Sequence, residues 1–201
     1  MRYALSALFF SSAALFLFAG NASPPAPPQL SAHFSPRGGC TDTVAAAIAA
    51  AAKSIHVQAY VLTSSPISAA IVAAKKRGVK IEVILDYKGS RINGSQYAWL
   101  QANHIDVAID KSHAIAHNKI IIIDQSRVLT GSFNFTEAAE SSNAENLITI
   151  EDTGIAAAFE SNWILHRQHS IIEPKSATPI GGECKSGTCG LEPPPSRSKR
   201  R

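Results

Sequence analysis

Few residues of this sequence belong to the types that mark specialised protein classes. Its 201 residues include only three cysteines, Cys40, Cys184 and Cys189, and no arrangement of them supplies the four ligands of a structural zinc site. The 12 glycines and 11 prolines are an ordinary share, which excludes a collagen-like or low-complexity chain. Charged residues make up 17% and hydrophobic residues 45%, so the chain can bury a core and is expected to form one domain.

Positive charge is scarce in the body of the chain. Residues 23–173 contain 12 Lys/Arg and 13 Asp/Glu, whereas residues 174–201 contain six Lys/Arg and two Glu. The net charge of +4 therefore comes mostly from the last segment, 174–201, which we expect to be a basic disordered tail. A body without net positive charge does not by itself indicate nucleic-acid binding.

The first 22 residues predict export. Arg2 precedes an uncharged apolar stretch over residues 4–20, and Gly20-Asn21-Ala22 places small residues before a cut after Ala22. Cleavage after Gly20 and retention as a membrane anchor are alternatives, although the stretch is short for a span of about 20 residues. We expect a signal peptide over 1–22, a Pro-rich spacer over 23–30 and a periplasmic or secreted product. Once cleaved, that product is expected to have no stable membrane partner and at least one disulfide.

Strand and helix patterns alternate between residues 31 and 173, the segment expected to form the folded domain. Strands are predicted over 31–35, 55–62, 79–85, 105–109, 119–124, 127–131 and 147–150. Helices are predicted over 41–53, 64–77, 96–103, 136–140 and 155–166. This alternation predicts an α/β fold, in which a mixed β-sheet is flanked by helices as an α/β sandwich in a single domain.

Four polar side chains near the middle of the chain are spaced for chemistry. His117 and Lys119 are two residues apart on a predicted strand and share a face, as do Ser132 and Asn134. A two-residue hairpin turn at residues 125–126 places Lys119 opposite Ser132. The same register places His117 opposite Asn134. A three-residue turn would shift the pairing by one residue and break both pairs. The lysine, hydroxyl and amide suit a phosphate group, and the imidazole suits a nucleophile or proton carrier.

No metal ion and no cofactor are predicted at this constellation. None of its members belongs to a carboxylate cluster of the kind that holds Mg²⁺. His113 lies four residues before His117, but the residues between them lead into a strand, so a metal pair on one helix face is not expected. No pattern indicates a function for His56, His104, His166 and His169.

The pattern HxKx4D beginning at His117, followed by GSxN beginning at Gly131, resembles the signature of the phospholipase D superfamily. With a single copy of the signature, the chain also resembles the small bacterial Nuc-like endonucleases. The resemblance covers roughly residues 33–169. It implies a phospholipase D-like fold and a metal-independent phosphodiesterase, with catalytic or phosphate-binding roles for His117, Lys119, Ser132 and Asn134. It also implies that Glu145 hydrogen-bonds the histidine ring and that Asp124 is mainly structural.

A single signature per chain implies a homodimer with a composite active site. One His117 would attack phosphorus and form a phosphohistidine, and the second would protonate the leaving oxygen and then activate water. The expected substrate is nucleic acid, with DNA and RNA both open. Phospholipid headgroups are the alternative substrate. A non-catalytic binding module is disfavoured because no signature residue is missing.

Overall fold

The computed structural model describes residues 27–174. Its strands are β1 (Gln29–Ser35), β2 (Ser54–Ala59), β3 (Lys80–Asp86), β4 (Asp106–Asp110), β5 (Lys119–Ile123), β6 (Arg127–Gly131) and β7 (Glu145–Glu151). Its helices are α1 (Cys40–Ala50), α2 (Ser65–Lys76), α3 (Tyr97–Ala102), α4 (Glu137–Ser141) and α5 (Thr153–His169), with a 3-10 turn η1 (Gly89–Arg91). The predicted succession of elements is confirmed, with ends that shift by a few residues. Because β1 begins at Gln29, the last two residues of the expected spacer belong to the sheet.

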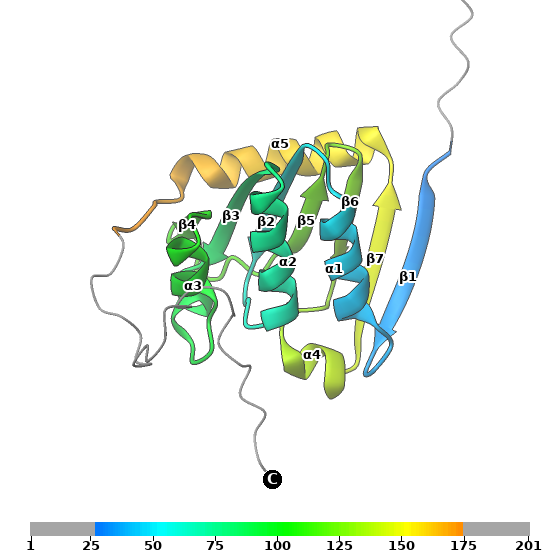
Figure 1. Ribbon diagram of the computed structural model, residues 1–201, viewed down its shortest axis with the longest axis horizontal. Coiled ribbons are helices and arrows are strands. Elements are labelled where there is room, and N and C mark those ends of the chain that lie inside the picture. The colour runs from blue at the N-terminus through cyan, green and yellow to red at the C-terminus, as the bar shows by residue number, and fades with distance from the viewer. Residues whose placement is uncertain (1–26, 175–201) are drawn as a thin grey trace, which may run out of the picture.

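The strands form one mixed sheet in the order β1-β7-β6-β5-β2-β3-β4. The strands β2, β3 and β4 are parallel to one another, and the remaining neighbours pair antiparallel. Helices α1 and α2 cover one face of the sheet, and α5 crosses the strands on the other (Figure 1). The predicted α/β fold with a mixed sheet flanked by helices is confirmed.

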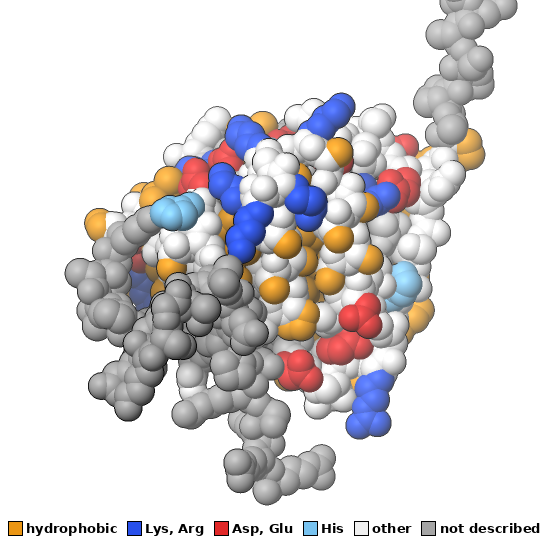
Figure 2. Space-filling model, in the orientation of Figure 1, with side chains coloured by type: hydrophobic (Ala, Val, Ile, Leu, Met, Phe, Trp, Pro, Cys, Tyr) orange, Lys and Arg blue, Asp and Glu red, His pale blue; other side chains and the backbone are white. Residues whose placement is uncertain are grey.

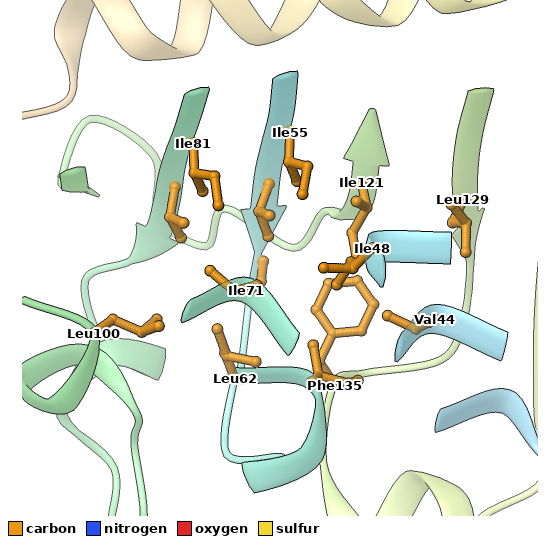
Figure 3. Packing of buried hydrophobic residues seen from close by; sticks show 14 of the residues in the cluster. Val44, Ile48, Ile55, Leu62, Ile71, Ile81, Leu100, Ile121, Leu129 and Phe135 are labelled. Atoms are coloured by element: carbon orange, nitrogen blue, oxygen red, sulfur yellow. The ribbon is translucent and has the colours of Figure 1, made fainter. Parts of the chain in front are cut away.

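The larger core lies between the sheet and the pair α1 and α2. Figure 3 shows Val44 and Ile48 of α1 and Ile71 of α2 on the side of the sheet that carries strand residues such as Ile55 and Ile121. Burying one such aliphatic side chain contributes about 1.5–3 kcal/mol. A smaller cluster lies under α5 and consists of Ile84, Ile120, Ile122, Val128, Ala156 and Trp163. The central strands β2, β3 and β5 are therefore buried on both faces, which explains their nearly continuous apolar sequences.

The hairpin between β5 and β6 corrects the predicted register. Its turn has three residues, because Ile123 pairs with Arg127 and Ile120 with Thr130. Asp124 (φ 51°) and Gln125 (φ 56°) adopt left-handed backbone conformations, which Asp tolerates better than most residues. The predicted two-residue turn is wrong, and continuing the observed register places Gly131, not Ser132, opposite Lys119.

Cys40 is a free thiol with no solvent exposure. Burial, followed by the charge of Glu140, raises the pKa of this thiol. The expected signal peptide, the tail, Cys184 and Cys189 lie outside the described residues. Within residues 27–174, none of the helices has the length and apolar character needed to cross a bilayer.

Candidate active site

His117 and Lys119 lie side by side where β5 begins. The Lys119 ammonium is 3.2 Å from Nδ1 of His117 and donates to the His117 carbonyl oxygen at 2.8 Å. The lysine side chain is buried, with 7% of its surface exposed, whereas His117 is exposed. The expectation that the two side chains share a face is therefore met by direct contact.

Neighbouring strands hold the segment that leads to His117. At the end of β3, the buried carboxylate of Asp86 accepts from the backbone N–H of Ala116 at 2.9 Å and of Gly89 at 2.8 Å. Just beyond β2, the N–H of Tyr60 donates to the carbonyl oxygen of Asn118 at 2.8 Å. These bonds fix the backbone on both sides of His117, so its exposed ring stands on a rigid base.

Tyr60 is a site residue that the sequence did not indicate. Its ring centroid lies 4.7 Å from that of His117, and the Lys119 ammonium lies 5.5 Å from the Tyr60 ring centroid. The Tyr60 ring therefore packs against one side of the imidazole and gives the ammonium a cation–π partner. In the sequence Tyr60 is simply the aromatic residue next to the end of a buried strand, so nothing distinguished it.

A glycine allows β6 to end against the start of β7. Gly131 has φ 148°, and a Cβ at this position would collide with the backbone oxygen of Asn146. The next residue, Ser132, accepts from the backbone N–H of Asn146 at 3.0 Å and from its Nδ2 at 3.3 Å. Since both contacts use the serine oxygen as acceptor, the Ser132 O–H stays free to donate to a phosphate oxygen.

The segment after Gly131 crosses the end of β5 that carries His117 and Lys119. It starts on β6 and reaches the chain beyond β2, where Phe135 bridges to Leu62. Since β5 lies between β6 and β2, the segment must pass over the end of β5. Phe133 and Phe135 are buried in the larger core, and Figure 3 shows Phe135 near Leu62. The alternating residues Ser132 and Asn134 therefore turn away from that core, on the segment that passes over the end of β5 carrying His117 and Lys119.

Asn134 has an unused hydrogen-bonding group. Its Oδ1 atom is buried and has no hydrogen-bond partner within the described residues. Leaving a buried polar atom unpaired costs about 1–3 kcal/mol. Rotation of the amide places its NH2 group at the same position, where it can donate to an anion.

The charges of the site centre on Lys119. Burial lowers the pKa of this lysine, and the carboxylate of Glu145 at the start of β7 acts in the opposite direction. The hydrogen bond expected between Glu145 and the histidine ring is replaced by another arrangement. Glu145 Oε1 accepts from Asn143 Nδ2 at 3.2 Å, and Nδ1 of His117 faces Lys119. Since an ammonium group only donates, this Nδ1 is an acceptor and Nε2 carries the ring proton.

The family profile described as cardiolipin synthase, PLD-like domain, matches residues 44–164, more than half of the chain. The chain belongs to the phospholipase D superfamily. It is 46% identical over 136 residues to a phospholipase D of Rickettsia felis, covering 68% of each chain. It is 33% identical over 113 residues to the mitochondrial cardiolipin hydrolase of Mus musculus, covering 56% of this chain and 51% of that protein.

Two solved structures share the fold. Nuc from Salmonella typhimurium, a phospholipase D family member, is 36% identical with a TM-score of 0.69, covering 72% of this chain and 97% of its own. NucT from Helicobacter pylori has a TM-score of 0.67 at 23% identity, over 72% of this chain and 99% of its own, and supports the fold alone. The described chain is thus a phospholipase D-type phosphodiesterase with one signature.

Asp124, the aspartate of the phospholipase D signature, lies away from the other signature residues. It follows the last residue of β5, roughly 17 Å along the strand from Lys119 at about 3.3 Å per residue. Its carboxylate accepts from the backbone N–H groups of Ala52, Lys53 and Ser54 at 2.7–2.9 Å. These contacts agree with the structural role implied by the resemblance and place Asp124 outside the reaction centre.

His113 also lies apart from the phospholipase D signature. It joins Asp110, His166 and His169 in a cluster whose side-chain nitrogen and oxygen atoms lie within 4.8 Å of one another. No function was expected for His166 and His169, yet they lie three residues apart on α5 and share a helix face. That spacing was the signal available in the sequence.

Proposed function

We propose that this phosphodiesterase hydrolyses phosphodiester bonds of nucleic acid, with His117 as nucleophile and no metal ion in the chemical step. The observation that carries the proposal is the contact between exposed His117 and buried Lys119, beneath the segment that holds Ser132 and Asn134. Support for a nucleic-acid substrate comes from the single copy of the signature, as in the Nuc-like endonucleases. The chain also spans 97% of Nuc, so the two have a similar extent.

In the first step, Nε2 of His117 attacks phosphorus and the bond from phosphorus to the leaving oxygen breaks. Lys119, Ser132 and Asn134 donate to the non-bridging oxygens, whose charge grows in the transition state. Attack by Nε2 requires the ring proton to sit on Nδ1. A bound phosphate would draw the Lys119 ammonium away from Nδ1, and Glu145 would then accept the Nδ1 proton in a hydrogen bond.

The second proton carrier would come from another copy of the chain, because the signature supplies one histidine. In a two-fold dimer the partner's His117 protonates the leaving oxygen and then removes a proton from the water that hydrolyses the phosphohistidine. Light scattering alongside activity over a dilution series tests this step. We expect activity to fall as the dimer dissociates, and a fully active monomer would contradict the proposal.

Phospholipid is the second candidate substrate. The Rickettsia relatives at 43–46% identity are named phospholipase D, and the mouse relative is named cardiolipin hydrolase. The same reaction centre would act on either phosphodiester, so the signature does not separate them. On the face shown in Figure 2, basic side chains gather near the end of α2 and acidic ones near α4. With charge of both signs on that face, we expect substrate affinity to depend on the site itself more than on a basic surface.

The deciding assay incubates the full chain with plasmid DNA, RNA and phosphatidylcholine vesicles, each with and without EDTA. His117→Ala serves as the matched inactive control. We expect cleavage of nucleic acid that persists in EDTA while the chain stays folded. Loss in EDTA that Mg²⁺ restores would contradict the metal-independent step, and hydrolysis of phosphatidylcholine with nucleic acid left intact would favour the second candidate.

A further inference from the structure

Three histidines and an aspartate from distant parts of the chain meet beside β4. Asp110 is the last residue of β4, His113 follows three residues later, and His166 and His169 lie on the last turns of α5. Asp110 Oδ2 is 2.9 Å from Nδ1 of His113 and 3.2 Å from Nδ1 of His166. Nε2 of His169 is 3.3 Å from the same oxygen.

Hydrogen bonding alone does not account for this arrangement. One carboxylate oxygen offers two lone pairs, yet three ring nitrogens point at Oδ2 of Asp110. The other oxygen, Oδ1, is already used by the backbone N–H of Ser112 at 2.9 Å and of His113 at 3.4 Å. Asp110 is fully buried, so the three ring nitrogens compete for one oxygen that solvent does not reach.

A divalent cation fits between these four atoms. A tetrahedral site with bonds of about 2.0–2.1 Å has ligand atoms separated by about 3.3–3.4 Å. The three separations from Asp110 Oδ2 already lie at 2.9–3.3 Å, and the widest separation in the cluster is 4.8 Å. The side chains of His113 and His169 are 44% and 36% exposed, so their rings are free to rotate the remaining distance inward.

We propose that Asp110, His113, His166 and His169 bind a zinc-class divalent cation in a closed structural site. Three imidazoles and one carboxylate are a donor set suited to Zn²⁺. Four protein ligands leave no open position for a substrate or a reactive water, which makes the site structural. The backbone donors on Oδ1 hold the carboxylate in place and leave Oδ2 for the cation.

The proposed site would fasten the end of α5 to the edge of the sheet and to the loop before His117. Next to it, Ile109 and Ile171 exchange backbone hydrogen bonds of 2.8 and 3.0 Å. His113 lies three residues before Ala116, whose N–H is held by Asp86. A cation on His113 would therefore brace the far end of the loop that presents the catalytic histidine. No ligand belongs to the signature, so this inference stands apart from the proposed reaction and substrate.

The test uses the full chain without an affinity tag, since a histidine tag would itself bind zinc. The protein is stripped with a chelator and titrated with Zn²⁺ and with Co²⁺, with elemental analysis of the bound metal. We expect one Zn²⁺ per chain, a higher melting temperature on saturation, and the visible absorption of tetrahedral Co²⁺. The absence of a thiolate charge-transfer band would show that cysteines are not the ligands.

Two substitutions separate metal binding from hydrogen bonding within the cluster. His166→Asn places an amide nitrogen near the position of Nδ1, and His169→Gln places one near the position of Nε2. Each keeps a donor toward Asp110 but removes an imidazole ligand, and we expect zinc affinity to fall at least about 100-fold. His33→Asn, on β1, is the control and should bind zinc like the wild type.

Wild-type protein that binds less than a tenth of an equivalent of Zn²⁺, with an unchanged melting temperature, would overturn the proposal. Equal zinc affinity in all three variants would overturn it as well. Because these readouts are stoichiometry, affinity and melting temperature, they do not depend on the substrate assay. Failure of the zinc site is therefore distinguishable from failure of the proposed nuclease activity.

Discussion

The two ends of β5 use polar side chains in opposite ways. Where the strand begins, the side chains of Lys119, Ser132 and Asn134 keep hydrogen-bonding capacity that the described residues do not fill. Where it ends, both carboxylate oxygens of Asp124 accept hydrogen bonds from three backbone N–H groups. The first end retains groups that can hydrogen-bond an anion, and the second joins the hairpin to the start of β2.

The fold also affects the charges at the two ends of β5 differently, since it disfavours the charge of Lys119 and favours that of Asp124. Burial lowers the pKa of Lys119, so the fold disfavours its charge until an anion compensates it. Burial pushes the pKa of Asp124 upward, but the three backbone N–H donors outweigh it, and the pKa is lowered. In the proposed mechanism, a single signature thus combines residues that act in the chemistry with a residue that stabilises the fold. Four predictions test this division.

The largest effect is expected at His117. His117→Ala removes the nucleophile and with it the covalent step, so single-turnover cleavage should fall at least about 10³-fold, with no phosphorylated enzyme. The lysine, serine and asparagine donors remain, so substrate binding in a gel-shift assay should be unchanged. Cleavage within tenfold of the wild type would mean that the reaction centre is assigned to the wrong residues.

Lys119→Ala should lower both binding and turnover, because phosphate is charged in the ground state and in the transition state. Loss of one such donor costs roughly 10²-fold in turnover. The pH profile of kcat/KM sharpens the test. Since the pKa of Lys119 is lowered from its ordinary 10.5, wild-type activity should decline on the alkaline side before pH 10.5, as the ammonium loses its proton. Unchanged binding by Lys119→Ala would remove the lysine from the phosphate site.

Glu145→Gln should have a milder effect, about tenfold in kcat/KM, because the glutamine keeps an oxygen that accepts a hydrogen bond. The charge it removes is the one that raises the pKa of Lys119 against burial. The alkaline limb of the pH profile should therefore move to lower pH in this variant. A limb that stays in place would show that Glu145 does not act on the lysine.

The sequence predicts the order of helices and strands because each buried element carries its own apolar pattern. It also predicts that His117 and Lys119 meet, since two residues along an extended chain is a local relation. The register of the hairpin between β5 and β6 could not be predicted from neighbouring residues alone. Asp124 and Gln125 take left-handed conformations in a turn that bonds to residues 52–54, some 70 positions earlier in the chain.

The histidine cluster was missed for a similar reason. Its members come from β4 with the loop that follows it and from α5, and these parts are separated in sequence by three other strands and a helix. Sequence spacing left His113 without an expected partner, because a pair with His117 on one helix face was not predicted, whereas the fold brings it to His166 and His169. Pairs of ligands at short spacing are visible in a sequence, but the pairing between two such pairs depends on strand order.

The smallest effect on activity is expected at Asp124. Asp124→Asn keeps a residue that tolerates the left-handed backbone but removes the charge that accepts three N–H bonds. We expect kcat/KM within about twofold of the wild type below the melting temperature, and a free energy of unfolding lower by about 1–3 kcal/mol. Because folding lowers the pKa of Asp124, its contribution is present above its ordinary pKa of 3.8 and is lost as pH falls through the folded value. The difference in unfolding free energy between wild type and variant, measured by denaturant titration, should therefore shrink in acid. A large loss of activity with unchanged stability would place Asp124 in the chemistry and erase the contrast between the two ends of β5.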